Sequence, residues 1–151
     1  MSYAVIGGTF DGLHKGHEAF ISKAFETGDK VLVCITSDAM VKGKPHHEMI
    51  DSFARRKSKV SAFLKARGWL GRAEIVSIDD PFTAGLRPGL TDIIVTQETR
   101  KNAERLNAMR KGRGLPKLAI AIVEWVRSDD GKPISDARIR KGEIDKNGRM
   151  L

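Results

Sequence analysis

The chain has 151 residues, of which 40% are hydrophobic and 30% are charged, a composition typical of a globular protein with a proper hydrophobic core. Its longest apolar run, around residues 118–126, is much shorter than the ~20 residues of a transmembrane helix, so no membrane span is expected. Lysine and arginine outnumber acidic residues by 27 to 19, and the formal net charge of +8 favours anionic partners such as nucleic acid, acidic lipid or a phosphorylated small molecule.

The single cysteine, Cys34, lies in the apolar run VLVCIT. It has no second cysteine with which to form an internal disulfide, and we expect it to be a small buried apolar side chain. The chain starts directly with a strand-like run, and no signal peptide is predicted. These features indicate a cytoplasmic protein.

Short apolar runs rich in β-branched residues alternate with amphipathic stretches along the chain. The runs are nearly continuous in apolar character, as in strands covered on both faces, and lie at residues 3–6, 31–35, 74–78, 92–95 and 118–123. Apolar residues at helical spacing predict helices at residues 17–25, 49–67, 98–111 and 135–141. This alternation predicts an α/β fold: one doubly wound, Rossmann-like domain over residues 1–151, with a parallel five-stranded sheet and helices on both faces.

Two clusters of basic residues, Arg55-Arg56-Lys57 and Arg110-Lys111, fall on predicted helices, where a solvated helix face is the ordinary explanation. A basic RNA-binding module is the alternative that the net charge leaves open. Aromatic residues make up only 6% of the chain and form no aromatic-rich strand on which bases could stack. We therefore expect no nucleic-acid partner.

Ligands of a doubly wound sheet bind beyond the carboxyl ends of its strands. The loops expected at that edge span residues 7–17, 36–45, 79–89 and 96–99, and they hold much of the unusual polar chemistry of the sequence. The pair His46-His47, which follows the second of these loops, is expected to be exposed.

The first loop reads GGTFDGLHKGH. It has neither the Gly-Lys-Ser/Thr ending of a P-loop nor the glycine spacing of a dinucleotide-binding fingerprint. The adjacent glycines Gly7 and Gly8 would let backbone N–H groups approach a phosphate closely, and Thr9 adds a hydroxyl. The loop is thus interpreted as a phosphate-binding turn of a different design.

Two histidines stand three residues apart at the end of this loop. Gly16 and His17 begin a helix whose N-terminus favours anions, and His14 and His17 can direct two imidazole N–H donors to one point. A zinc site and a purely structural turn are alternatives, but no convincing third ligand and no cysteine pair lie nearby, so no metal ligand is assigned. Asp11 is expected to stabilise the turn rather than to act as a catalytic carboxylate.

The same loop resembles the signature of the HxGH nucleotidyltransferases, whose fold is similar to the catalytic core of class I aminoacyl-tRNA synthetases. The family pattern G-T-F-D reads here as residues 8–11, and H-x-G-H as residues 14–17. A second signature, usually Ile-Ser-Ser-Thr-x-Arg, resembles ISDARIRKGEID at residues 134–145. One departure is plain, because Asp136-Ala137 stands where the family usually has Ser-Thr.

Within this superfamily the chain most resembles the phosphopantetheine adenylyltransferases of archaeal and eukaryotic type. The resemblance covers essentially the whole chain and includes the stretches TSDAMVKGK, DPFTAG, IVTQETRKNAERLNAMRKGRGLP and DGKPISDARIRKGEID. It implies transfer of AMP from ATP to 4′-phosphopantetheine, with Mg²⁺ bound mainly through the ATP phosphates. Other acceptors, namely glycerol 3-phosphate, FMN or NMN, and CTP in place of ATP, are the alternatives within the superfamily.

The resemblance also implies roles for single residues. His14 and His17 would donate hydrogen bonds to phosphate oxygens as charge builds at the α-phosphate. Thr9 would bind the phosphate of the acceptor, and a lysine of TSDAMVKGK, either Lys42 or Lys44, would neutralise it. The loop residues implied to lie against the substrates are Gly7, Gly8, Phe10 and Gly16.

On the far side of the triphosphate, the resemblance implies that Ser135 and Arg138 hold the β- and γ-phosphates. Arg138 has the stronger claim because its forked guanidinium suits phosphate oxygens. Arg140 is expected at the surface. The Asp136 carboxylate would fall near the triphosphate, or else serve the helix dipole.

The loop after the fourth strand resembles the nucleotide side of the family's site. It implies that Thr96, Glu98 and Thr99 lie near the adenosine, with simple helix capping as the alternative for Glu98 and Thr99.

Overall fold

The computed structural model describes residues 1–124 and 126–151, with Asp136 described by its backbone alone. Among these residues, a five-stranded parallel sheet has the order β3-β2-β1-β4-β5. Its strands are β1 (Tyr3–Gly8), β2 (Lys30–Thr36), β3 (Ala73–Ile78), β4 (Asp92–Val95) and β5 (Ala119–Ile122). The helices are α1 (Lys15–Thr27), α2 (Asp38–Val41), α3 (Phe53–Ala66), α4 (Arg100–Gly112) and α5 (Asp136–Arg140), with 3₁₀ turns at His47–Met49, Leu70–Arg72 and Thr83–Leu86.

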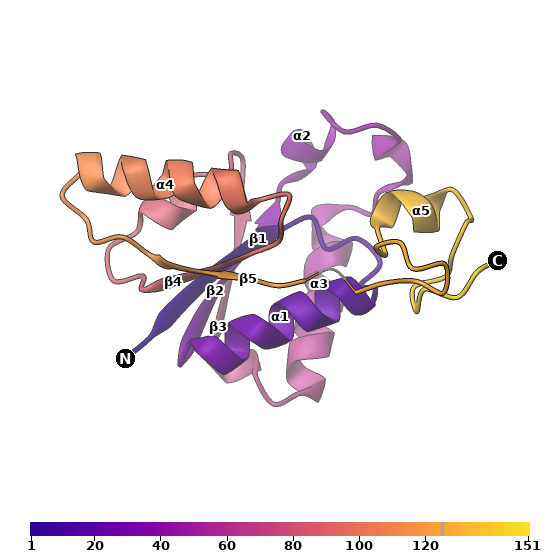
Figure 1. Ribbon diagram of the computed structural model, residues 1–151, viewed down its shortest axis with the longest axis horizontal. Coiled ribbons are helices and arrows are strands. Elements are labelled where there is room, and N and C mark those ends of the chain that lie inside the picture. Colours follow the sequence, from indigo (N-terminus) through magenta and orange to yellow (C-terminus); the bar gives the residue numbers. More distant parts are fainter. Residues whose placement is uncertain (125) are drawn as a thin grey trace.

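Successive residues of β1 face opposite sides of the sheet and enter two separate cores. Ala4 and Ile6 pack with buried residues of α1 and α3, whereas Val5 packs with Leu106 of α4. Figure 1 accordingly shows α1 and α3 on one face of the sheet and α4 on the other. The predicted α/β fold with helices on both faces is confirmed.

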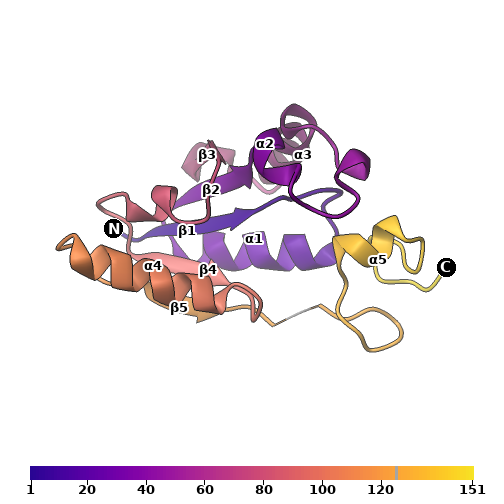
Figure 2. The same cartoon turned by 90° about the horizontal axis from the view of Figure 1, so that it is seen from above.

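The chain runs from β1 outward to β3 and then returns to β4 on the other side of β1. This reversal of strand order lies between the carboxyl ends of β1 and β4, where doubly wound sheets form a ligand crevice. α5 and the C-terminus lie beyond that edge of the sheet, opposite the N-terminus (Figures 1 and 2).

The predicted helix boundaries shift by a few residues. α3 begins at Phe53, four residues later than expected, because Ser52 caps it by accepting the Arg55 N–H through its hydroxyl. α2 and the 3₁₀ turns were not predicted, since segments of three or four residues carry too little periodicity. Gly68 stops α3 as expected, with a left-handed φ of 75°.

The expectation of solvated basic clusters is wrong for Arg56 and Arg110, which are both completely buried. The reason is that each guanidinium finds carbonyl oxygens inside the fold. Arg110 donates to the carbonyls of Gly85 and Arg87, which fastens α4 to the segment before β4, and to the carbonyl of Pro116 in the segment before β5.

Cys34 is buried in the core beneath α4, as expected. Burial raises the pKa of its thiol to about 12, so the group stays protonated and unreactive near neutral pH. No helix in the part of the chain that the structure describes is long and apolar enough to cross a membrane.

Candidate active site

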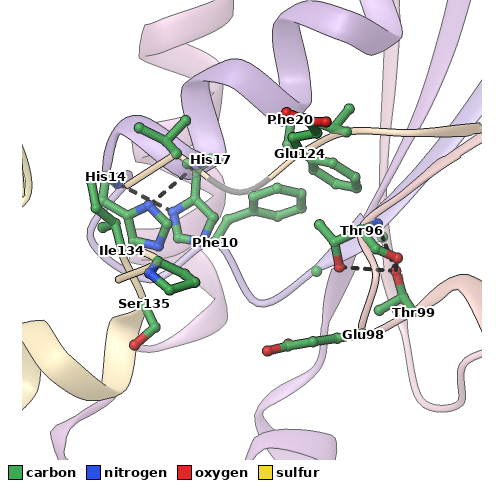
Figure 3. A pocket seen from close by; sticks show the side chains of 16 residues that line it. Phe10, His14, His17, Phe20, Thr96, Glu98, Thr99, Glu124, Ile134 and Ser135 are labelled. Atoms are coloured by element: carbon green, nitrogen blue, oxygen red, sulfur yellow. Dashed lines mark hydrogen bonds between the residues drawn. The ribbon is translucent and has the colours of Figure 1, made fainter. Parts of the chain in front are cut away.

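A pocket of about 260 Å³ opens at the point where the strand order reverses (Figure 3). The carboxyl ends of β1, β4 and β5, the first turn of α1 and the segment before α5 form its walls. Ten residues predicted for the site line it: Gly7, Gly8, Phe10, His14, Gly16, His17, Thr96, Glu98, Thr99 and Ser135. The residues predicted for the site therefore form most of the lining of this pocket, and their substrate-binding roles stay predictions.

The two histidines hold each other in place at the start of α1. His14 Nδ1 accepts the backbone N–H of His17 at 3.3 Å, and His17 Nδ1 accepts the backbone N–H of His14 at 3.3 Å. The rings stack with centroids 3.8 Å apart. A ring nitrogen that accepts a hydrogen bond carries no proton, so in each neutral imidazole the proton resides on Nε2.

The charge state of both histidines follows from their surroundings. Burial lowers the pKa of His14 to about 4. Burial, together with repulsion from the neighbouring His14, lowers the pKa of His17 to about 3. Near neutral pH both rings are therefore uncharged, and each carries its proton on Nε2. Such N–H groups can donate hydrogen bonds to anionic oxygens without transferring the proton.

Two features of the loop make this stack possible. A Cβ at Gly16 would lie 2.7 Å from His14 Cε1 and 2.9 Å from its Nδ1, so only glycine leaves room for the ring. Phe10 adopts a left-handed φ of 54°, unusual for a bulky residue, and its buried ring meets His17 edge-on with centroids 5.5 Å apart. This backbone outlier could not be read from the sequence pattern.

A second polar cluster lies beside the pocket, on the β2 side of the first loop. The Thr9 hydroxyl accepts hydrogen bonds from Thr36 Oγ1 at 3.0 Å and from Lys44 Nζ at 2.5 Å. Lys42 is exposed at the C-terminal end of α2. Of the two lysines that the sequence left open, Lys44 is the one that the structure places against Thr9.

Arg138 lies outside the pocket lining in this structure. Its guanidinium pairs with Asp130 at 2.6 Å and Glu143 at 3.0 Å, and donates to the Ser128 hydroxyl at 2.8 Å. Hydrogen bonding from Ser128 and Arg138 lowers the pKa of Asp130 to about 2. Ser135 lines the pocket and caps α5 by accepting the Arg138 N–H. The phosphate-binding roles of both residues stay predictions.

The expectation that Arg140 lies at the surface is wrong. Its side chain is only 18% exposed, and Nη1 lies 3.7 Å from Asp11 Oδ2, so it joins α5 to the first loop. The other Asp11 oxygen accepts the Asp51 N–H at 3.2 Å, consistent with a stabilising role for Asp11. The Asp136 carboxylate, expected near the triphosphate, lies outside the described side chains.

The loop after β4 borders the opposite side of the pocket. Thr99 occupies the N-cap position of α4, yet its hydroxyl accepts the backbone N–H of Thr96 at 3.1 Å instead of capping the helix. Figure 3 shows Thr96, Glu98 and Thr99 together on this side. Their side chains are therefore placed at the pocket, and helix capping does not account for Thr99.

Six further residues line the pocket that were not assigned to it from the sequence: Phe20, Val123, Glu124, Val126, Pro133 and Ile134. Glu124 follows the carboxyl end of β5, so the rule that located the other loops would have found it. Phe20 looked like an ordinary core residue of α1. His46 and His47 are exposed, as expected. Within the described chain, no three His, Cys, Asp or Glu side chains are grouped to hold a metal ion.

Comparison with known proteins gives a consistent result over nearly the whole chain. The profile of the family described as Cytidylyltransferase-like matches residues 5–142. A phosphopantetheine adenylyltransferase of Pyrococcus abyssi is 41% identical over 149 residues, covering 97% of this chain and 94% of the relative. One from Methanosarcina barkeri is 39% identical over 153 residues, covering 99% of this chain and 93% of the relative.

Among solved structures, a protein of unknown function from Archaeoglobus fulgidus is similar in fold, with a TM-score of 0.71. It is 31% identical, and the match covers 82% of this chain and 89% of that chain. The architecture described above is thus shared with an experimentally determined relative.

Proposed function

Since the chain belongs to the cytidylyltransferase-like family, alongside the phosphopantetheine adenylyltransferases of archaea, we propose that it transfers AMP from ATP to 4′-phosphopantetheine, forming dephospho-coenzyme A and pyrophosphate. The observation that carries this proposal is the arrangement of two polar groups, each suited to bind an anion, in and beside the first loop. The His14–His17 pair faces the pocket, and the Thr9–Lys44 pair lies next to it.

The chemistry needs no general base from the protein. The second pKa of a phosphate monoester is about 6, so the acceptor phosphate is already an anionic nucleophile near neutral pH. One of its oxygens attacks the α-phosphorus of ATP in line, a new P–O bond forms, and the bond to the leaving pyrophosphate breaks. The protein's task is to position two polyanions and to stabilise the charge that develops.

Each cluster has a role in this step. His14 and His17 donate Nε2–H hydrogen bonds to oxygens of the α-phosphate and the leaving pyrophosphate. Because both rings are uncharged, they act as preorganised dipoles and give up no proton. Thr9 and Lys44 hold the acceptor phosphate, with the lysine offsetting the repulsion between nucleophile and nucleotide.

The nucleotide occupies the pocket between the first loop and the loop after β4, with its adenosine near Thr96, Glu98 and Thr99. Arg138 would bind the β- and γ-phosphates by exchanging Asp130 and Glu143 for phosphate oxygens. ATP would bind as its magnesium complex, in which phosphate oxygens and water supply most of the ligands of Mg²⁺.

Pyrophosphate release tests the proposal. We expect release when the protein, Mg²⁺, ATP and 4′-phosphopantetheine are mixed, and only background release when the acceptor is left out. Parallel assays with CTP, and with glycerol 3-phosphate, FMN or NMN as acceptor, test the related reactions of the superfamily. Faster turnover with one of these pairs would contradict the proposed acceptor or nucleotide.

A further inference from the structure

Arg56 of α3 is completely buried, and its guanidinium lies beneath the loops that follow β1 and β2. Nη1 donates to the carbonyl oxygens of Thr9 at 3.0 Å and of Thr36 at 2.8 Å, and Nε donates to the carbonyl of Asp51 at 2.9 Å. Nη2 pairs with Asp38 at 3.2 Å. One side chain thus ties together segments that surround the proposed acceptor-phosphate site.

A further contact of Arg56 sets the direction of a hydroxyl relay. Nη1 also donates to Thr36 Oγ1 at 3.2 Å, and Thr36 Oγ1 in turn donates to Thr9 Oγ1 at 3.0 Å. An arginine has no acceptor atom, so the proton of the Thr36 hydroxyl cannot point back toward Arg56. It points to Thr9.

Two hydrogen bonds fill the acceptor capacity of the Thr9 hydroxyl. A hydroxyl accepts two hydrogen bonds and donates one. Thr9 Oγ1 accepts from Thr36 and from Lys44, so both acceptor positions are taken. Its own O–H donates to no group among the residues that the structure describes, and an anionic phosphate oxygen would be a strong acceptor for it.

We propose that Arg56 is a positioning residue for the acceptor phosphate: through Thr36 it holds the Thr9 hydroxyl as a donor to that phosphate. This inference rests on the proposed function, because it concerns the site at which the phosphorylated acceptor binds. It assigns Arg56 no contact with either substrate.

Arg110 supplies a matched control. It is also an arginine of a helix, also completely buried, and it also donates to backbone carbonyls, but those belong to Gly85, Arg87 and Pro116. None of these carbonyls belongs to the first loop or to the loop after β2. Arg56→Lys and Arg110→Lys therefore disturb comparable buried networks, of which only one leads to Thr9.

The test is steady-state kinetics of both variants with each substrate varied in turn, together with thermal unfolding. Arg56→Lys keeps the charge but loses the fork, and we expect it to raise KM for 4′-phosphopantetheine about tenfold or more, with KM for ATP within about twofold of wild type. Arg110→Lys should leave both KM values within about twofold of wild type. It should lower the unfolding temperature by about as much as Arg56→Lys does.

Thr36→Val provides a second variant that is nearly isosteric and leaves Arg56 in place. It removes only the middle hydroxyl of the relay, and we expect a smaller rise, about three- to tenfold, in KM for the acceptor alone. This variant decides the question if Arg56→Lys does not fold.

Two results would overturn the role of Arg56 while leaving the proposed function intact. One is an equal rise in KM for ATP and for the acceptor in Arg56→Lys and Thr36→Val. The other is an acceptor KM in these two variants that is indistinguishable from that of Arg110→Lys. A wild-type protein that releases no pyrophosphate with 4′-phosphopantetheine would instead contradict the proposed function, and this inference with it.

Discussion

His14 and His17 each use Nδ1 to bind the other's backbone N–H, so the residues that face the substrate also build the turn that carries them. This reciprocal arrangement, closed by the stacked rings, selects the Nε2–H tautomer in both. Burial keeps both rings neutral. At the residue scale, the site is a pair of fixed dipoles, and the positive charge comes from Lys44 on the far side of Thr9.

Replacing one histidine should therefore slow the chemical step. We expect His17→Ala to lower kcat about 10²–10³-fold, the usual cost of losing one preorganised donor, with a much smaller change in KM for ATP. His47→Ala, at an exposed histidine outside the pocket, serves as the control and should keep wild-type kcat. A His17→Ala enzyme with near wild-type kcat would remove His17 from the mechanism.

The roles of the two lysines of TSDAMVKGK, Lys42 and Lys44, can be distinguished by measuring KM for 4′-phosphopantetheine in variants of each. Lys44→Ala should raise KM for 4′-phosphopantetheine about tenfold or more, because it removes the cation that contacts Thr9. Lys42→Ala should change KM by less than about twofold, since Lys44 is the lysine whose ammonium group contacts Thr9. The reverse order of the two effects would show that Lys42 is the phosphate ligand.

The lowered histidine pKa values also predict how stability depends on pH. In the unfolded chain a histidine takes up its proton near pH 6.5, but in the fold only near pH 4 for His14 and pH 3 for His17. The unfolded state therefore binds more protons over this interval, and stability falls as pH is lowered through it. Between pH 7 and pH 5 we expect a loss of about 1–2 kcal/mol for each histidine.

Urea unfolding at several pH values measures this effect. The His14→Asn/His17→Asn variant keeps side-chain acceptors at both positions, and it should lose less stability than wild type between pH 7 and pH 5. Parallel curves for the two proteins would show that these histidines do not carry the depressed pKa values.

At the scale of elements, the turn from β1 into α1 has strict steric requirements. It combines the left-handed Phe10 with the close approach of the His14 ring to Gly16. α3 supports this turn from below through Arg56, and α5 reaches it through the pairing of Arg140 with Asp11. Separate elements thus hold one loop in place.

Gly16→Ala tests the steric requirement directly. The added methyl would overlap the His14 ring, so we expect kcat to fall at least tenfold and stability to fall by about 1–3 kcal/mol. Gly112→Ala is the matched control, because it adds a methyl at the last residue of α4, where a Cβ would meet no described atom within 4 Å beyond its chain neighbours and its own helix backbone. It should be neutral or slightly stabilising. Equal behaviour of the two variants in kinetics and thermal unfolding would contradict the role of Gly16.

At the scale of the whole molecule, the alternation of apolar runs and helical stretches predicted the fold, because parallel strands buried on both faces leave a strong pattern. The rule that ligands bind at the carboxyl ends of the strands then located most of the pocket. The prediction of exposed side chains was wrong for three arginines, Arg56, Arg110 and Arg140. Helical spacing cannot show that the fold supplies carbonyl oxygens or a carboxylate as hydrogen-bond acceptors for a guanidinium. Their burial is decided by tertiary partners, as is the unusual backbone of Phe10.

Identification of the product tests most directly whether this chain joins AMP to 4′-phosphopantetheine. Wild-type protein incubated with Mg²⁺, ATP and 4′-phosphopantetheine should form dephospho-coenzyme A and pyrophosphate in equal amounts, as measured by mass spectrometry and a coupled pyrophosphate assay. Pyrophosphate without dephospho-coenzyme A, or no reaction of this acceptor while another phosphorylated acceptor is consumed, would contradict the account.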